Sequence, residues 1–281
     1  MNPLLAQLFP DRPYFDGATA GRQCTIARHA EIASFVSLLD RPRVDILEIG
    51  SWIGHSALTW SDAIAAFCAD KGTVVCMDPW TPYFAPEEQR AQGPYVQMDS
   101  IARAGLAYDL FLHNAKFAAP GVEIRHLRGS LSDYDRFLAD GAFDLVYVDG
   151  SHYCEDVLND LRRSERLLKS GGILCGDDLE LQLDECDEVF ARAHPRTDFV
   201  ADPRTATMFH PGVAVAVHDF FGGRVWSENG VWAMRKLAPR TYSAPQLAGR
   251  KFLVPRNFPD QDRISLANAL RQAAGAAERG S

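Results

Sequence analysis

Acidic residues stand at the ends of the segments of this chain that have the composition of buried β-strands. Five carboxylates lie within or directly after such segments: Glu48, Asp78, Asp149, Asp177 and Asp178. A single Asp after a strand usually caps the next helix, but ligands of an open parallel sheet bind outside the carboxyl ends of its strands. Because five carboxylates at one edge would repel one another, the pattern favours a cationic partner there. A positively charged cofactor or a divalent metal would serve.

The first of these segments leads into a glycine loop, within VDILEIGSWIGHSALTW at 44–60. Gly50 and Gly54 bracket a turn in which the backbone can approach a ligand closely, with amides free at the following helix N-terminus. Plain strand-to-helix packing is the alternative. The E-x-G-x-x-x-G spacing differs from the G-x-G-x-x-G of dinucleotide sites, which disfavours a nicotinamide oxidoreductase. Asp78 follows Gly50 by 28 residues and suits a ribose diol; the alternative is a turn residue before Pro79.

The elements that must position these residues alternate along the chain. We expect strands at 44–49, 73–77, 122–127, 143–148 and 173–176, with helices between them at about 54–69, 108–117, 131–139 and 153–169. A helix at 183–193 follows, and then an antiparallel pair formed by 212–221 and 230–236. The sequence therefore predicts an α/β fold, a doubly wound and mostly parallel seven-stranded sheet with an antiparallel final strand.

Segments outside this alternation set the domain boundaries. Residues 1–43 are predicted to be an N-terminal arm with a helix at 24–39, and residues 44–236 a ligand-binding domain. The aromatic-rich insertion 79–107 has the length of a lid or binding loop, or of a surface excursion that caps the sheet edge. Residues 237–281 form a proline-rich extension that ends in a helix at 261–277. The sequence leaves open whether this extension wraps the domain or mediates a homodimer or higher homo-oligomer.

Composition excludes several classes of function. The 281 residues carry a net charge of −8 with 47% hydrophobic content, so no basic field favours nucleic acid or an anionic membrane. The N-terminus lacks a signal-peptide pattern, and no apolar run approaches the ~20 residues of a membrane span. The six cysteines form no C-x-x-C pair, which favours reduced, mostly buried thiols over zinc ligands or disulfides. We expect a cytoplasmic protein.

Several stretches of the chain resemble the class I S-adenosylmethionine-dependent methyltransferases. Within them the chain is similar to small-molecule O-methyltransferases of the catechol type and the macrolide-sugar, or macrocin-like, type. The resemblance covers about residues 44–236 and rests on these stretches: LEIGSWIGHS, VVCMDPW, LRGSLSDY, FDLVYVDGSHYCEDVLNDLRRSERLLKSGGILCGDDLE and the pair VAVHDFFG and GVWAMRK.

The resemblance implies a cofactor site and a metal site. Gly50, Ser51, Trp52 and Gly54 would line the methionine part of S-adenosylmethionine, with Glu48 at its ammonium, Asp78 at the ribose and Gly129-Ser130 at the adenine. Ser56 and Asp149 complete the expected cofactor residues. Asp149, Asp177 and Asp178 would hold a divalent ion, since three carboxylates give the oxygen shell that Mg²⁺ prefers. The catechol type has Asp then Asn at the last two positions, whereas this chain has two Asp.

His152 is the predicted catalytic base, because it lies three residues after Asp149, where the macrolide-sugar type has a histidine. A histidine of near-neutral pKa can accept the proton of an attacking hydroxyl; a plain helix N-terminal residue is the alternative. His218 and Asp219 are expected to end a strand, where they would contact substrate or form an ordinary edge-strand pair. One face of the 153–169 helix is predicted to be solvated: Asp156, Asp160, Arg162 and Arg163.

The sequence thus predicts an S-adenosylmethionine-dependent methyltransferase that carries out metal-assisted O-methylation of a small molecule, such as a sugar or natural product. Two alternatives stay open: a metal-independent O- or N-methyltransferase, and a non-catalytic S-adenosylmethionine-binding protein. A nucleic-acid methyltransferase is disfavoured by the acidic charge and by the lack of an Asn/Asp-Pro-Pro-aromatic motif.

Overall fold

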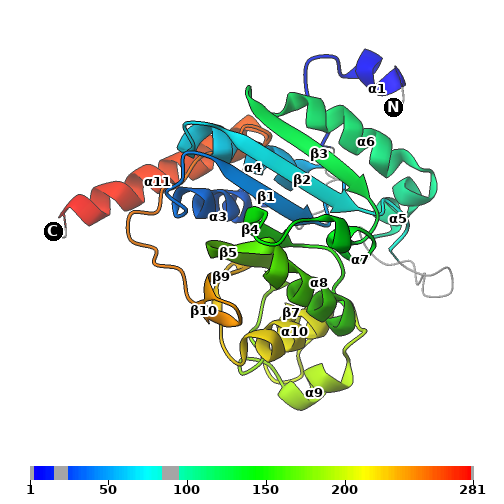
Figure 1. Ribbon diagram of the computed structural model, residues 1–281, viewed down its shortest axis with the longest axis vertical. Coiled ribbons are helices and arrows are strands. Elements are labelled where there is room, and N and C mark those ends of the chain that lie inside the picture. The colour runs from blue at the N-terminus through cyan, green and yellow to red at the C-terminus, as the bar shows by residue number, and fades with distance from the viewer. Residues whose placement is uncertain (1–2, 16–24, 84–94, 280–281) are drawn as a thin grey trace.

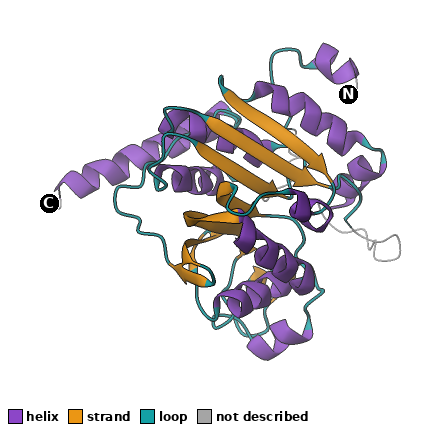
Figure 2. Cartoon of the chain, in the orientation of Figure 1, coloured by secondary structure: helices purple, strands orange, loops and turns teal. Residues whose placement is uncertain are grey.

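A single large sheet forms the centre of the protein (Figures 1 and 2). The computed structural model describes residues 3–15, 25–83 and 95–279. The strand order is β10-β9-β5-β4-β1-β2-β3, and β8 also pairs with β9. The strands of this sheet are β1 (Val44–Ile49), β2 (Gly72–Asp78), β3 (Val122–Arg128), β4 (Phe143–Val148), β5 (Leu168–Leu179), β8 (Trp226–Glu228), β9 (Gly230–Ala238) and β10 (Thr241–Ser243). A separate ribbon pairs β6 (Val200–Ala201) with β7 (Met208–Phe209).

Strands β1 to β5 are parallel to their neighbours, and β9 runs antiparallel to β5. This confirms the predicted doubly wound, mostly parallel sheet, with eight strands in place of seven. The strand order reverses between β1 and β4, since β1 leads outward to β2 and β3 while β4 leads to β5. Ligands of such sheets bind at this reversal, beyond the carboxyl ends of the strands.

Helices cover both faces of the sheet. They are α1 (Pro3–Leu8), α3 (Ile26–Ser37), α4 (His55–Phe67), α5 (Tyr95–Arg103), α6 (Leu106–Asn114), α7 (Leu131–Tyr134), α8 (Cys154–Leu167), α9 (Glu188–Ala193), α10 (Pro211–Phe221) and α11 (Asp260–Arg279), with short 3₁₀ turns at Ala115–Phe117 and Asp135–Phe137. Successive strand residues alternate between two buried clusters: Ile46 packs with α3, α4 and α6, whereas Leu47 packs with α8 and α10. This alternation explains the near-continuous apolar strands, because both faces are covered.

The prediction of a strand at 212–221 is wrong, because these residues form helix α10. Pro211 occupies the first helical turn and Gly222 ends the helix in the left-handed conformation, which are favourable positions for these residues. A helix that is apolar on most sides is stable when buried, and α10 packs against α8 and α9. In the hairpin, β9 pairs with β8 instead. Asn229 and Gly230 have φ values of 54° and 86°, as an Asn-Gly hairpin turn requires.

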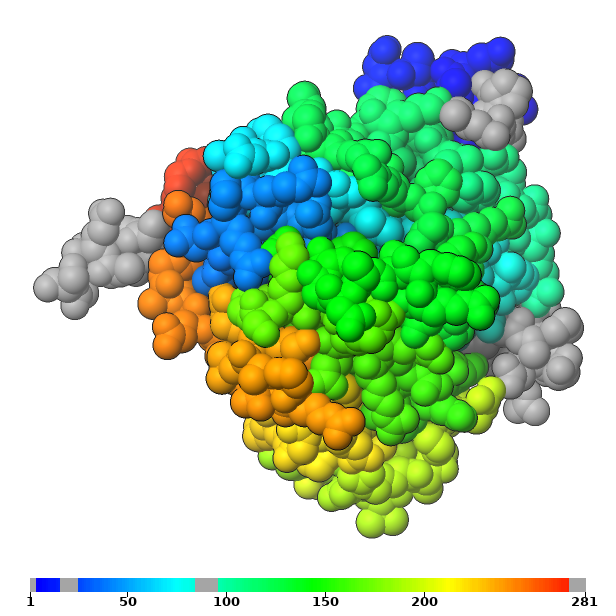
Figure 3. Space-filling model, in the orientation of Figure 1, coloured from blue at the N-terminus to red at the C-terminus, as the bar shows by residue number. Residues whose placement is uncertain are grey.

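The two terminal segments pack on the domain. In the C-terminal extension, Arg250 pairs with Glu31 of α3, and the side chain of Arg256 pairs with Asp62 of α4. The orange surface of this extension lies beside the blue surface of α3 in Figure 3, and α11 then leads away from the sheet (Figure 1). In the N-terminal arm, the Tyr14 backbone N–H donates to Asn114 Oδ1 at 2.7 Å.

Part of the predicted lid, residues 84–94, lies outside the described residues, as does Cys24; the remainder of 79–107 includes α5 and the start of α6. Four of the five described cysteines are buried. No helix in the described ranges combines the length and apolarity that crossing a bilayer requires.

Candidate functional site

The glycine loop after β1 lies against the end of β4. The Asp149 N–H donates to the Ile49 carbonyl at 2.8 Å, and the Gly50 N–H donates to the Met77 carbonyl at 2.8 Å. Gly50 has a φ of 85°, and a Cβ added to it would lie 1.9 Å from the Asp149 carbonyl oxygen. Both the left-handed conformation and the close backbone approach therefore require glycine.

Asp78 at the end of β2 holds this loop in place. Its Oδ2 accepts hydrogen bonds from the backbone N–H groups of Ser51 at 3.1 Å and Trp52 at 2.9 Å, and its Oδ1 accepts one from Trp80 at 2.5 Å. Burial raises the pKa of Asp78, and the three amides act in the opposite direction. Asp78 also lines the pocket described below, so it is placed both to organise the loop and to face a ligand.

Glu48 lies beneath the loop and is fully buried. The indole Nε1 of Trp60 donates to its Oε1 at 3.1 Å, and the thiol of Cys76 donates to its Oε2 at 3.4 Å. Burial raises the pKa of Glu48, while hydrogen bonds from Ser51 and Ser56 lower it. Glu48 and Gly54 are absent from the pocket lining; the other predicted cofactor residues belong to it. The expected contact of Glu48 with an ammonium group stays a prediction.

We expect Trp60→Phe to lower the free energy of unfolding by about 1–3 kcal/mol, because a buried carboxyl group loses a hydrogen-bond donor. Urea denaturation measures the change. In a Glu48→Gln background the same substitution should cost less, since the two residues act as a pair. An equal cost in both backgrounds would show that only the packing of the indole matters.

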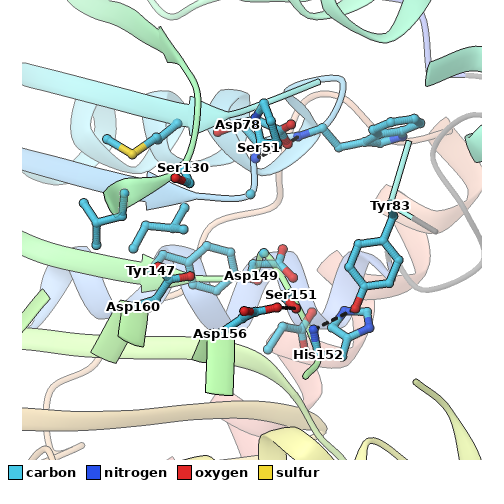
Figure 4. Close-up of a pocket in the computed structure, with 18 of the residues that line it drawn as sticks. Ser51, Asp78, Tyr83, Ser130, Tyr147, Asp149, Ser151, His152, Asp156 and Asp160 are labelled. Atoms are coloured by element: carbon cyan, nitrogen blue, oxygen red, sulfur yellow. Dashed lines mark hydrogen bonds between the residues drawn. The ribbon is translucent and has the colours of Figure 1, made fainter. Parts of the chain in front are cut away.

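A pocket of about 660 Å³ opens at the carboxyl ends of β1, β2, β4 and β5. This volume is typical of small-molecule and cofactor sites. Figure 4 shows Ser51 and Asp78 on one side, Asp149 in the middle, and His152 below Tyr83. The predicted residues that line the pocket are Gly50, Ser51, Trp52, Ser56, Asp78, Gly129, Ser130, Asp149, His152, Asp177 and Asp178.

Helix α8 forms one wall of the pocket, which was not predicted from the sequence. Asp156, Asp160 and Arg163, which were predicted to lie on a solvated face, line the pocket. The hydroxyl of Ser151 donates to Asp156 at 2.8 Å (Figure 4). Burial, followed by the charge of Asp156, raises the pKa of Asp160 to about 7, and Arg163 opposes this rise. Only Arg162 of the four predicted residues is absent from the lining.

His152 is held between two carboxylates. Its Nε2 lies 3.0 Å from Asp178 Oδ2 and its Nδ1 lies 2.6 Å from Asp198 Oδ1. Burial alone would lower the pKa of His152, but Asp178 and Asp198 outweigh burial and raise the pKa well above its usual value. The His152 backbone N–H donates to the Tyr83 hydroxyl at 3.0 Å (Figure 4). The arrangement orients the ring and stabilises an imidazolium.

The prediction that His218 and Asp219 end a strand is wrong, because both lie in the last turn of helix α10. Their side chains are 36% and 38% exposed, and neither lines the pocket. Asp219 pairs with Arg192 at 3.0 Å. His55 does line the pocket, and its Nε2 lies 3.0 Å from the Asn257 carbonyl oxygen in the C-terminal extension.

The three carboxylates expected to hold Mg²⁺ lie together but face other partners. Arg28 Nη1 lies 2.9 Å from Asp177 Oδ1 and 3.7 Å from Asp178 Oδ1. Asp178 Oδ2 faces His152, while burial and the charges of Asp177 and Asp178 raise the pKa of Asp149.

Within the described part of the chain, two groups bring ligand atoms within 4.8 Å of one another: His152-Asp198-His210 and Asp178-Glu180-His210. The predicted trio is neither of them. The arrangement around Arg28 therefore does not fit the converging oxygen shell of Mg²⁺.

Arg28 and Asp198 were not predicted from the sequence as residues of the site, and Tyr83 was predicted only as part of the aromatic-rich insertion 79–107. Arg28 comes from the N-terminal helix, Tyr83 from the segment after β2, and Asp198 from the segment between α9 and β6. None stands in a motif. Each reaches the carboxyl edge of the sheet only because the chain folds back on it.

Part of this chain is similar to a known family of domains. Residues 47–179 match the family model described as a methyltransferase domain, a range that holds the glycine loop, His152 and the two aspartates of β5. No curated protein gives a significant match.

Three solved structures illustrate the similar folds. Cofactor-bound Rv0187 from MTB is 18% identical, covers 83% of this chain and 96% of its own, and has a TM-score of 0.42. The O-methyltransferase from Bacillus cereus in complex with SAH is 13% identical, with 83% and 96% covered and a TM-score of 0.42. CalS11, a TDP-rhamnose 3'-O-methyltransferase of calicheamicin biosynthesis, is 14% identical, with 83% and 91% covered and a TM-score of 0.41.

These TM-scores lie below 0.5, so the similarity in function rests on the matched domain alone. The order β3-β2-β1-β4-β5, the antiparallel β9, and the glycine loop that opens onto the pocket all lie in or beside the matched range. Residues 47–179 of this chain are thus similar to the methyltransferase domain family.

Proposed function

We propose that this protein is a class I S-adenosylmethionine-dependent methyltransferase, which transfers the methyl group of S-adenosylmethionine to a hydroxyl group of a small molecule, a sugar or natural product. The observation that carries the proposal is the placement of His152 at the pocket wall between Asp178 and Asp198. In its neutral form, with one ring nitrogen turned from its carboxylate partner toward the substrate, this histidine can accept a proton from a hydroxyl group within hydrogen-bond reach. The 660 Å³ pocket has room for a small molecule beside the glycine loop.

In the proposed reaction, the hydroxyl oxygen attacks the methyl carbon of the sulfonium. The carbon–sulfur bond breaks with its electron pair going to sulfur, and the hydroxyl proton passes to the neutral imidazole of His152. Asp178 and Asp198 stabilise the imidazolium that results. Pocket residues hold the oxygen, carbon and sulfur in line, and this alignment supplies much of the rate enhancement.

For the cofactor, we propose contacts with the glycine loop residues Gly50 to Gly54, with Asp78 and with Ser130. The pocket lining and the amides that Asp78 fixes support this assignment. Asp78 retains lone pairs with which it can accept hydrogen bonds from a ribose diol. The acidic lining also suits the positive charge of a sulfonium.

Metal assistance, which the resemblance implies, has weaker support than proton transfer to His152. A bound Mg²⁺ would need oxygens of Asp149, Asp177 and Asp178 to converge, and Asp177 is paired with Arg28. None of the steps above uses a metal ion. A non-catalytic protein that only binds the cofactor is the second candidate, because Asp78, and not His152, accepts the hydrogen bonds of the loop amides.

Asp78→Ala should weaken binding of S-adenosylhomocysteine about tenfold to a hundredfold, because the loop amides of Ser51 and Trp52 lose their acceptor and the ribose loses its partner. Isothermal titration calorimetry measures the change. Asp219→Ala, at the exposed end of α10, is the matched control and should bind as the wild type does. Unchanged affinity in Asp78→Ala would contradict the proposed cofactor site.

A turnover assay distinguishes the proposed methyltransferase from a protein that only binds the cofactor. Incubation with S-adenosylmethionine and a panel of hydroxylated sugars and phenols should release S-adenosylhomocysteine with one acceptor class. Tight binding without release for any hydroxylated acceptor would favour the non-catalytic protein.

A further inference from the structure

The guanidinium of Arg28 lies against a carboxylate cluster at the end of β5, which consists of Asp177, Asp178 and Glu180. Its Nη1 lies 2.9 Å from Asp177 and 3.7 Å from Asp178, and its Nη2 lies 3.2 Å from Glu180. Its Nε donates to the Asn229 carbonyl at 2.8 Å. The Arg28 side chain is only 15% exposed, and it lines the pocket. Every edge of the guanidinium therefore faces an acceptor of the β5 end or of the β8–β9 turn.

The turn between β8 and β9 is shaped to receive this group. A Cβ added to Gly230 would lie 2.2 Å from Arg28 Nη2, and Gly230 has a φ of 86°. Any side chain at this position would displace the guanidinium. On the other side, the hydroxyl of Thr25 caps helix α3 by accepting from the Arg28 backbone N–H at 3.2 Å. Two segments some 200 residues apart in the chain thus fix Arg28 at the cluster.

A guanidinium carries a permanent positive charge. It stays protonated in proteins, and its planar fork matches carboxylate geometry. A divalent cation beside Asp177 would have to sit next to this charge, and like charges disfavour one another. A lysine in such a cluster could lose its proton and with it the positive charge, whereas an arginine cannot.

We propose that the Arg28 guanidinium takes the place of a divalent cation at the Asp177-Asp178-Glu180 cluster, so that methyl transfer by this chain requires no metal. Arg28 balances the carboxylate charge and thereby keeps Asp178 in position against His152. It is a positioning residue, because it acts on the acceptor side through Asp178. Only the activity measurement below rests on the proposed function; the metal-binding measurement does not.

The test begins with Mn²⁺, followed by electron paramagnetic resonance of the free ion. The wild-type protein should leave the free Mn²⁺ signal unchanged. Arg28→Ala should bind one Mn²⁺, because Asp177, Asp178 and Glu180 lose their cation, and the double variant Arg28→Ala/Asp177→Asn should lose that site again. Arg192→Ala removes an arginine that pairs with carboxylates outside the pocket, and this matched control should bind no Mn²⁺.

Activity supplies the second measurement. Wild-type turnover should survive EDTA unchanged, while Arg28→Ala should lose about a hundredfold in kcat and regain part of it on addition of Mg²⁺ or Mn²⁺. Arg28→Lys keeps the charge without the fork and should retain more activity than Arg28→Ala. S-adenosylhomocysteine binding checks that each variant is folded.

Stoichiometric Mn²⁺ binding by the wild type, or loss of its activity in EDTA with recovery on Mg²⁺, would overturn the inference. Full metal-free activity of Arg28→Ala would overturn it as well. If Arg28→Ala does not fold, the wild-type titration and the EDTA experiment still decide. If no acceptor is methylated, the proposed function fails, and the Mn²⁺ comparison still tests the cation replacement.

Discussion

His152→Gln should lower kcat by about a hundredfold to ten-thousandfold, the range that a positioned general base contributes. Glutamine keeps a polar side chain of similar length but cannot take up the proton of the acceptor hydroxyl. The affinity for S-adenosylhomocysteine should stay unchanged, because Asp78 accepts the hydrogen bonds of the loop amides, whereas the His152 ring pairs with Asp178 and Asp198. Single-turnover methyl transfer and calorimetry measure the two quantities.

The matched control is His218→Gln, a histidine on the exposed end of α10, which should keep full activity. Comparable losses in both variants would show that the loss has a cause other than proton transfer. Full activity of His152→Gln would eliminate His152 as the base.

The pH profile offers a separate readout of the same role. Because only neutral His152 can accept a proton, and because Asp178 and Asp198 raise its pKa, kcat/KM should rise with pH and level off above the usual histidine range. Asp198→Asn removes one of the two charges, so the rise should move to lower pH. A profile that does not move would mean that another group controls the rate.

Gly50→Ala should destabilise the fold by about 3–5 kcal/mol, among the larger effects of single substitutions. The new methyl group would lie 1.9 Å from the Asp149 carbonyl oxygen, so the ends of β1 and β4 must separate. The left-handed φ of 85° adds a further cost for alanine. Cofactor binding should be lost together with stability, because the same loop carries both. Urea denaturation and calorimetry measure these changes.

Gly222→Ala is the control for the conformational part alone. Gly222 has a φ of 73° and nothing within 4 Å of an added Cβ, so only about 1–2 kcal/mol should be lost. Equal costs for the two alanine substitutions would show that the approach of β4 to Gly50 is not tight.

The local pattern determined much of the fold. Strands β1 to β5 are buried on both faces, so their apolar runs stand out whatever the surroundings. Their carboxyl ends meet at one edge as a consequence of parallel pairing, and this brought Asp78, Asp149, His152, Asp177 and Asp178 to one pocket. The glycine spacing at 50–54 was legible because only glycine accepts that backbone conformation and that close approach.

The interpretation of 212–221 failed because local pattern alone could not distinguish strand from helix there. In VAVAV, alternating β-branched residues suit a strand, but a helix that is buried on most sides accepts the same residues. Packing against α8 and α9 decided the outcome. Asp156, Asp160 and Arg163 were misjudged for a related reason, since a polar face on a helix looks the same whether it meets solvent or a polar pocket.

By itself, the sequence determined the parallel sheet, the glycine loop and the row of carboxylates, because each depends on neighbours within one strand-turn-helix unit. Only the tertiary structure decided what those carboxylates face. Arg28, Asp198 and His210 come from other parts of the chain, and no local pattern records which distant charge will lie against Asp177 and Asp178. Charges that neutralise a buried cluster can be drawn from anywhere in the chain, so their source depends on how the helices and turns pack around the sheet.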